Sequence, residues 1–153
     1  MLHNIENFIE WSDKGHDWKN EVCSVGLEIH TEANTQHYQT FDPEINWLKD
    51  FASSRFSHYT ISIIKQLPGK VIPLHVDQYH YFKQHYNITD ESKILRINIF
   101  LEDWKKGQYF EMDGVPIVKW KAGQYVVLNN TIEHMSSNMG REVKYTAQIT
   151  GVE

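Results

Sequence analysis

Two histidines and one aspartate have the residue types and the spacing of a metal site. His75 and Asp77 are separated only by Val76, and side chains two residues apart in a strand point to the same side of a sheet. They can therefore act as neighbouring ligands. His134 lies far downstream, where an apolar strand runs into a polar turn. Arriving from another strand, it would complete a set of two imidazoles and one carboxylate on one side of a metal.

This ligand set leaves the opposite coordination positions of the metal open, an arrangement typical of non-haem Fe(II) oxygenases. A His-x-acid motif alone is weak evidence, because the chain contains 9 His and 20 acidic residues. A second example occurs at His30 and Glu32, but it runs into a polar tract typical of a strand end or loop. His80 and His85 are further alternatives, which we rank lower because they lie in a predicted loop with nothing rigid to aim them.

The last predicted strand carries a lysine on its polar face. Lys144 and every second residue after it are polar, and the residues between them are mostly apolar. If the apolar face packs against another layer, the polar face lies in a barrel lumen or in solvent. In a lumen, Lys144 could hold the distal carboxylate of a dicarboxylic co-substrate. The sequence is equally compatible with an exposed lysine, and Arg141 in the preceding turn is a weaker alternative anchor.

The predicted strand over 94–101 has two faces of the same kind. Arg96 and Asn98 share the face opposite its aliphatic residues. An arginine in the middle of a strand needs water or an anion, so Arg96 lies either on an exposed sheet face or near a carboxylate in a pocket. We expect Trp104 and Trp120 to be packing residues of the core or rim.

Length and composition indicate one globular domain over 1–153, large enough to bury a core. The net charge of -5, without a run of basic residues, argues against a nucleic-acid partner. Cys23 has no second cysteine to pair with, which fits a reducing compartment. No secretory signal and no apolar run of membrane-spanning length is apparent. We therefore expect a soluble cytoplasmic protein; the sequence does not indicate its oligomeric state.

The N-terminal part, 1–56, is expected to contain helices and a strand. Apolar spacing predicts an amphipathic helix over 2–9, and alternation predicts a strand over 21–30. A second helix should bury its apolar stripe from 45 to 52, with Asp42 as its cap and Pro43 in its first helical position.

The C-terminal part, 57–153, consists mainly of predicted strands, which cover 57–65, 71–76, 94–101, 108–112, 115–120, 125–128 and 143–150. Asp113 and Gly114 signal a tight hairpin between two of them. This pattern favours a mainly β fold of the jelly-roll or double-stranded β-helix type, with the helices packed outside. The longest predicted loop, 78–93, directly follows the His-x-Asp motif. Its Tyr79, Tyr81 and Tyr86 are candidates for a substrate wall.

In this order and spacing, the motifs resemble those of the Fe(II)- and 2-oxoglutarate-dependent dioxygenases, in particular the small aspartyl/asparaginyl β-hydroxylase-like and proline hydroxylase-like branch. The resemblance covers roughly 62–151. The matching features are Pro68-Gly69, His75-x-Asp77, an Arg-x-Asn-x-x-Leu strand that starts at Arg96, Trp120-Lys121-Ala122-Gly123, His134 and a cation ten residues later.

The resemblance implies roles for these residues. It makes His75, Asp77 and His134 the Fe(II) ligands and Lys144 the anchor of the 2-oxoglutarate distal carboxylate. The anchor in this group is more often an arginine, so Lys144 is a departure from the pattern. The carboxylate of Asp77 argues against a halogenase, whose pattern has a small residue there to admit halide.

Further positions are implied to line the co-substrate or substrate pocket. These are Arg96 and Asn98, the latter at a position that is often His in the group. Ile64 occupies the place of a serine that helps to bind the co-substrate in some members. Ser62 and Gln66, on the same strand face, are candidates to replace it.

The implied activity is hydroxylation of a C–H bond in an amino acid, a protein side chain or a small metabolite. The reaction would consume O2 and 2-oxoglutarate and release succinate and CO2. The alternative is a non-catalytic jelly-roll module that binds a metal or another ligand, which the lysine in place of arginine and the small size favour. The substrate cannot be read from the sequence, because substrate choice resides in loops.

Overall fold

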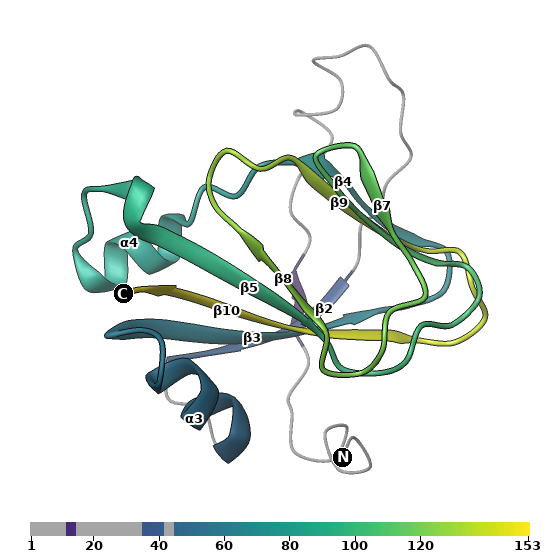
Figure 1. Ribbon diagram of the computed structural model, residues 1–153, viewed down its shortest axis with the longest axis horizontal. Helices are drawn as coiled ribbons and strands as arrows, with labels where there is room; N and C mark the ends of the chain where they lie inside the picture. Colours follow the sequence, from purple (N-terminus) through teal and green to yellow (C-terminus); the bar gives the residue numbers. More distant parts are fainter. Residues whose placement is uncertain (1–11, 15–34, 42–44) are drawn as a thin grey trace.

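The structure is a computed structural model that describes residues 12–14, 35–41 and 45–153. These residues form two sheets that face each other, with short helices at their margins (Figure 1). Every pairing among the described strands is antiparallel. The architecture is therefore the jelly-roll type expected from the sequence.

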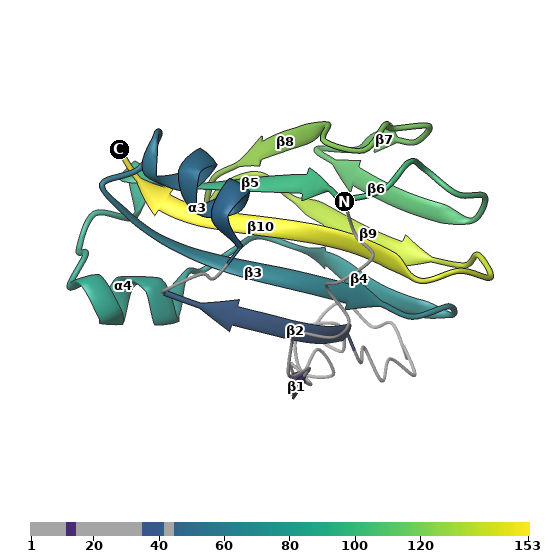
Figure 2. The same ribbon diagram turned by 90° about the horizontal axis from the view of Figure 1, so that it is seen from below.

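The strands divide unequally between the two sheets. The six-stranded sheet contains, in spatial order, β1 (Ser12–Lys14), β2 (Thr35–Thr40), β3 (His58–Gln66), β10 (Lys144–Val152), β5 (Ile94–Phe100) and β8 (Tyr125–Leu128). The four-stranded sheet contains β4 (Lys70–His75), β9 (His134–Asn138), β6 (Gln108–Met112) and β7 (Val115–Ile117). Figure 2 shows β3 and β10 running side by side along the length of the first sheet.

The outer face of the six-stranded sheet is covered by the helix α3 (Asn46–Ser53), which lies on the side away from the four-stranded sheet (Figure 1). Its Leu48 and Ala52 are fully buried against aliphatic side chains of the central strands. These side chains are Ile61, Ile63, Ile97, Ile99, Ala147 and Ile149. They alternate along their strands, so the residues between them point to the inner face.

The inner face of the same strands is polar and buried. Lys144, Thr146 and Thr150 on β10 and Asn98 on β5 are each less than a tenth exposed. Register places Asn98 level with Gln148. The predicted two-faced character of the final strand and of 94–101 is therefore confirmed, and the polar face lines the space between the sheets rather than solvent.

Predicted and observed strands agree within one or two residues for most of the C-terminal part. The hairpin at Asp113 and Gly114 is confirmed, with φ of 48° and 74° in the turn between β6 and β7. The strand predicted over 115–120 is too long. It ends at Ile117, because Lys119 adopts a left-handed conformation with φ of 59° that a strand cannot continue through.

Five described elements were not predicted: the strands β1 and β2 of the N-terminal part, and two helical elements and one strand of the C-terminal part. The segment 78–93, expected to be a loop, contains the helix α4 (His80–Tyr86) and the 3-10 turn η1 (Glu91–Lys93). The strand β9 was not recognised either, because its sequence after His134 is mostly polar. β9 lies between β4 and β6, and its backbone is paired on both sides.

Some predictions for the N-terminal part fall outside the described residues. These are the helix over 2–9, the strand over 21–30 and the cap formed by Asp42 and Pro43. The helix predicted after that cap is present, but it begins at Asn46, with Ile45 in the N-cap position and without a side-chain cap. Within the described parts of the chain, every helix is too short or too polar to traverse a lipid bilayer.

Candidate metal centre

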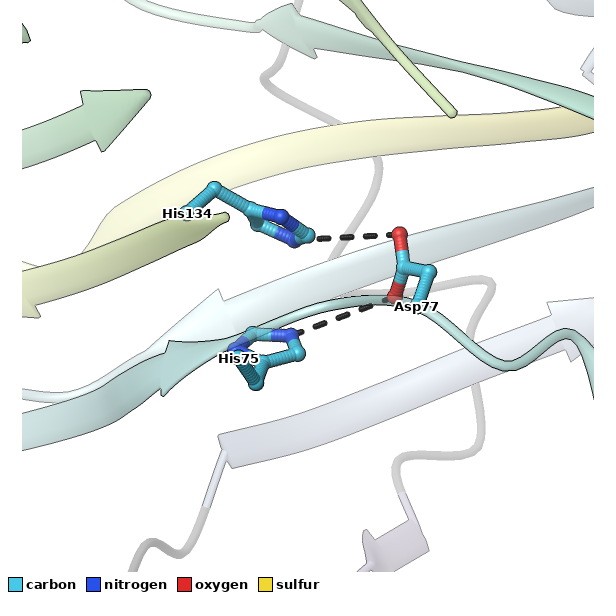
Figure 3. Close-up of side chains that lie close together, drawn as sticks. All are labelled: His75, Asp77 and His134. Atoms are coloured by element: carbon cyan, nitrogen blue, oxygen red, sulfur yellow. Dashed lines mark ion pairs between the residues drawn. The ribbon is translucent and has the colours of Figure 1, made fainter. Parts of the chain in front are cut away.

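The structure brings His75, Asp77 and His134 together between the two sheets (Figure 3). One potential ligand atom from each lies within 4.8 Å of the others. His75 is the last residue of β4 and pairs in register with His134, the first residue of β9. Asp77 follows two residues later, beyond the end of the strand rather than within it. The pairing of β4 with β9 therefore positions the cluster.

Both imidazole rings are oriented by backbone carbonyls. Nδ1 of His75 lies 2.7 Å from the carbonyl oxygen of Pro73, and Nδ1 of His134 lies 3.1 Å from that of Ile132. A ring that donates from Nδ1 carries its lone pair on Nε2. The two Nε2 atoms face Asp77, at 3.9 Å from Oδ1 for His75 and 3.7 Å from Oδ2 for His134. This is the orientation that metal-binding histidines need.

The protonation state of His75 also suits a ligand. Burial, followed by the nearby His134 ring, lowers its pKa to about 4. The ring is therefore neutral at neutral pH, and its approach to Asp77 is not an ion pair. A neutral imidazole is the form that binds a metal.

The two carboxylate oxygens of Asp77 differ in their environment. Oδ1 accepts a hydrogen bond of 2.6 Å from Nη1 of Arg96. Oδ2 is buried and has no hydrogen-bond partner among the described residues. A buried carboxylate oxygen without a partner is energetically costly, so it marks a place where a cation would be stabilised. The donor set of two imidazole nitrogens and this oxygen fits a divalent transition metal such as Fe(II).

Lys144 lies deep between the sheets. It is 2% exposed, and Nζ donates to the carbonyl oxygen of Tyr109 and to Oγ of Ser136, both at 2.7 Å. The rings of Phe110 and Trp120 lie 5.7 and 5.1 Å from Nζ. Burial lowers the pKa of Lys144 to about 7. No carboxylate of the described residues forms an ion pair with it.

Ser136 connects Lys144 to the group formed by His75, Asp77 and His134. It follows His134 by two residues on β9, so their Cα atoms are about 7 Å apart and their side chains share one face. Oγ of Ser136 also donates to Oε1 of Gln66. The hydroxyl of Ser136, with Nζ of Lys144 bonded to it, thus lies on the face of β9 that also carries His134. The sequence did not indicate Ser136, because its place beside Lys144 depends on β9 being a strand.

The other predicted pocket residues lie on the inner face of the six-stranded sheet. Nδ2 of Asn98 is buried without a hydrogen-bond partner among the described residues. Ser62 is half-buried and level with Asn98, because both pair with Gln148. Gln66 is occupied by hydrogen bonds to Lys70 and Ser136.

The alternative residues lie elsewhere. Arg141 is exposed in the turn between β9 and β10, unlike the buried Lys144. His80 and His85 are exposed on α4, where His80 contacts Gln78 and His85 stacks on Phe41. The motif at 30–32 lies outside the described residues.

The three tyrosines proposed for a substrate wall differ in burial and in their contacts. Tyr79 is buried, and its ring lies 5.1 Å from the guanidinium of Arg96. Tyr81 is 73% exposed. Tyr86 donates to the carbonyl of Tyr59 and stacks on His58. Tyr79 thus lies beside the arginine that is hydrogen-bonded to Asp77. Trp120 is buried and Trp104 packs against its cluster, which confirms their predicted packing role.

Comparison with known proteins supports the fold. No model of a protein family matches the chain, and no curated protein matches it. Among solved structures, a prolyl-4-hydroxylase of Pseudomonas putida is similar over 96% of this chain and 94% of its own, with a TM-score of 0.59 and 14% identity. A predicted oxalate decarboxylase of Thermotoga maritima is similar over 96% of both chains, with a TM-score of 0.54 and 13% identity.

A third similar structure is KdgF from a Halomonas species, which matches over 97% of this chain and 92% of its own. Its TM-score is 0.52 and its identity 10%. At these identities the similarity establishes the architecture alone. The chain therefore has a cupin-like double-stranded β-helix fold, and any activity must be argued from its own residues.

Proposed function

We propose that this protein is an Fe(II)- and 2-oxoglutarate-dependent dioxygenase that hydroxylates a C–H bond of an amino acid, a protein side chain or a small metabolite. The observation that carries the proposal is the buried Lys144, whose Nζ donates to Ser136, two residues along β9 from His134 of the cluster. A metal cluster alone would suit many cupin-like proteins. A buried cation without a carboxylate partner in the described residues suits one end of a dicarboxylate whose other end reaches the metal.

In this proposal, different residues would bind the metal and the co-substrate. His75, His134 and Oδ2 of Asp77 would hold Fe(II) from one side, which leaves positions for the co-substrate and O2. With 2-oxoglutarate and O2 as co-substrates, Fe(II) at this site would supply the oxidising chemistry for C–H hydroxylation, with succinate and CO2 as the other products. Lys144 and Ser136 would bind the distal carboxylate, and the rings of Phe110 and Trp120 would exclude water from this ion pair.

The binding step can be tested without knowing the substrate. Anaerobic addition of Fe(II) and 2-oxoglutarate should give a weak visible charge-transfer absorption, which requires the co-substrate to chelate the metal. Lys144→Met should weaken this absorption at limiting 2-oxoglutarate. Lys121→Met is the matched control, because the Lys121 side chain is exposed and pairs with Asp103 instead of lying buried between the sheets. A colourless wild-type protein that also fails to convert 2-oxoglutarate to succinate would overturn the proposal.

One observation favours the alternative of a non-catalytic metal- or ligand-binding module. Nζ of Lys144 already donates to Tyr109 and Ser136, so the lysine could serve as a structural cross-link between the sheets. In that case metal would still bind, but 2-oxoglutarate would leave the absorption of the metal complex unchanged.

A further inference from the structure

We propose that Arg96 is a positioning residue that occupies one oxygen of Asp77, so that this carboxylate binds the metal through its other oxygen alone. The inference rests on the proposed function, because it needs a metal at the cluster. It assigns Arg96 a role different from the co-substrate or substrate contact that the sequence resemblance implied.

The contact joins the two sheets at the metal cluster. Arg96 lies on the inner face of β5, and Asp77 follows the end of β4 in the opposite sheet. Nη1 donates to Oδ1 of Asp77 at 2.6 Å, a short charge-assisted hydrogen bond. Both side chains are mostly buried, with 20% of the arginine and 9% of the aspartate side chain exposed. Such a bond is screened less than one at the surface.

The guanidinium is itself fixed in place. Nε donates to Oγ1 of Thr150 at 3.0 Å, and the ring of Tyr79 lies 5.1 Å from Cζ. Thr150 is 2% exposed and pairs in register with Arg96 across β10 and β5. The planar guanidinium group can therefore hold Oδ1 in one direction, which a flexible ammonium would do less well.

Fixing Oδ1 has a consequence for coordination. Carboxylates can bind a cation through one oxygen or through both. Oδ2 lies 3.7 Å from Nε2 of His134 and has no hydrogen-bond partner among the described residues. Chelation through both oxygens would require Oδ1 to give up its bond to Arg96. The arginine thereby keeps open a position that a chelating carboxylate would occupy.

The positive charge of Arg96 should lower the affinity for a metal ion, whereas its hydrogen bond to Asp77 should raise it. A guanidinium near a divalent cation repels it, so removal of the charge alone would strengthen metal binding. Removal of the orienting hydrogen bond would weaken it, as the loss of an outer partner of a metal ligand generally does, by about 10- to 100-fold. The two roles therefore predict changes of opposite sign in metal affinity.

The test uses the full chain with Co(II) as the only added ligand. The dissociation constant and the visible Co(II) spectrum, which responds to the number and arrangement of ligands, are measured for wild type, Arg96→Met, Arg96→Lys and His134→Ala. Arg55→Met is the matched control, because Arg55 is exposed at the end of α3. Denaturant unfolding without metal reports any structural role of Arg96 separately.

We expect Arg96→Met to weaken Co(II) binding about 10- to 100-fold and to alter the spectrum. Arg96→Lys keeps the charge but not the planar group, and should give a smaller loss with an altered spectrum. Arg55→Met should match the wild type. If Arg96→Met does not fold, the spectrum of Arg96→Lys decides the question.

The inference is overturned if the Arg96 variants bind Co(II) as tightly as the wild type, or more tightly, with an unchanged spectrum while His134→Ala does not bind. That outcome leaves the metal site intact. Failure of the wild type to bind Co(II), or wild-type binding by His134→Ala, would instead overturn the proposed function on which the inference rests.

Discussion

The two faces of the six-stranded sheet are built from alternate residues of the same strands, yet they differ in almost every physical respect. The outer face is aliphatic and packs against α3 through Leu48 and Ala52. The inner face is also largely buried but carries the polar residues Lys144, Asn98 and Thr150. Burial of aliphatic side chains stabilises a fold, whereas burial of polar side chains costs free energy unless they form hydrogen bonds. The aliphatic core and the candidate site thus lie on opposite faces of this sheet.

The distribution of unpaired polar atoms strengthens this contrast. In the described part of the chain, buried side-chain atoms without a hydrogen-bond partner occur at Asp77 Oδ2, Tyr79 Oη and Asn98 Nδ2. They lie in the metal cluster, beside Arg96 and on the inner face, respectively. Burial, followed by the Asp77 carboxylate, raises the pKa of Tyr79, which keeps its hydroxyl a hydrogen-bond donor. Unpaired groups of this kind are expected where a ligand completes the structure.

The largest effect should come from removal of a candidate ligand on the inner side. His134→Ala should abolish Fe(II) binding, because the remaining imidazole and carboxylate cannot hold the metal on one face. Metal content after anaerobic loading and gel filtration measures this. His80→Ala is the control, since His80 lies exposed on α4 and should not matter. The reverse pattern would contradict the assignment of the ligands.

The outer face should respond in stability instead. Leu48→Ala should lower the free energy of unfolding by about 2–5 kcal/mol, because it removes a fully buried side chain and leaves a cavity. Below the melting temperature, metal and 2-oxoglutarate binding should stay at wild-type levels. Asp50→Ala on the exposed side of α3 should change the unfolding free energy by less than about 0.5 kcal/mol. A loss of metal binding in folded Leu48→Ala would contradict the expectation that the outer face affects stability but not binding.

Lys144→Met should have the converse effect. It should weaken 2-oxoglutarate binding by about 10- to 100-fold, since a hydrogen bond to a charged group contributes about 1.5–3 kcal/mol. The ligand-free protein should unfold at the same or a higher denaturant concentration, because a buried charge has been replaced by an apolar chain of similar length. Isothermal titration and urea unfolding measure the two quantities. Marked destabilisation with unchanged co-substrate affinity would make Lys144 a structural residue.

Lys144 should also impose a pH dependence on co-substrate binding, and its effect per pH unit is smaller than that of removing the lysine. Its pKa is lowered to about 7 in the ligand-free protein, and an anionic ligand binds the protonated form. The affinity for 2-oxoglutarate should therefore fall as the pH rises above about 7, by up to about tenfold per pH unit. Titrations between pH 6 and about pH 9 test this. Lys144→Met should have weak affinity without this slope, and a wild-type affinity that rises with pH would contradict the mechanism.

The lowered pKa of Lys144 also predicts how the free energy of unfolding changes with pH. Because the folded protein loses the Lys144 proton at a lower pH than the unfolded chain, the unfolded state binds more protons between pH 7 and the ordinary lysine pKa of about 10.4. The contribution of this group to the free energy of unfolding should therefore increase with pH across that window. If this increase with pH is absent in Lys144→Met, Lys144 is the group that causes it.

The strands with regular alternation were predictable because each has one aliphatic face. β9 was not, since Ser136, Ser137 and Asn138 carry no hydrophobic period and have low strand propensity. Pairing with β4 and β6 overrides that preference. α4 was missed for a related reason: it has no capping side chain and begins after Tyr79 in a left-handed conformation. Burial of Phe82 against Tyr79 and Ile94 is what stabilises it.

In the candidate site too, some features could be predicted from the sequence and others could not. His75 and Asp77 form a local motif, and His134 follows at a recognisable position, so sequence reasoning could propose them. The bond between Arg96 and Asp77 joins residues from opposite sheets, and the contact of Lys144 with Ser136 depends on the unrecognised β9. Neither has a local signature. The sequence thus indicated which residues have suitable chemistry, but not which of them hold one another in place.

The partners of the two imidazole Nδ1 atoms are main-chain carbonyls, those of Pro73 and Ile132. Every amino acid supplies such a carbonyl, so the orientation of His75 and His134 does not require any particular neighbouring side chain. Lineages that retain the backbone path can exchange the surrounding residues freely and still inherit the same ring orientation. The orientation of the two rings therefore tolerates substitution at neighbouring positions, and similar candidate sites are better sought by the course of the strands than by the residue types around the histidines.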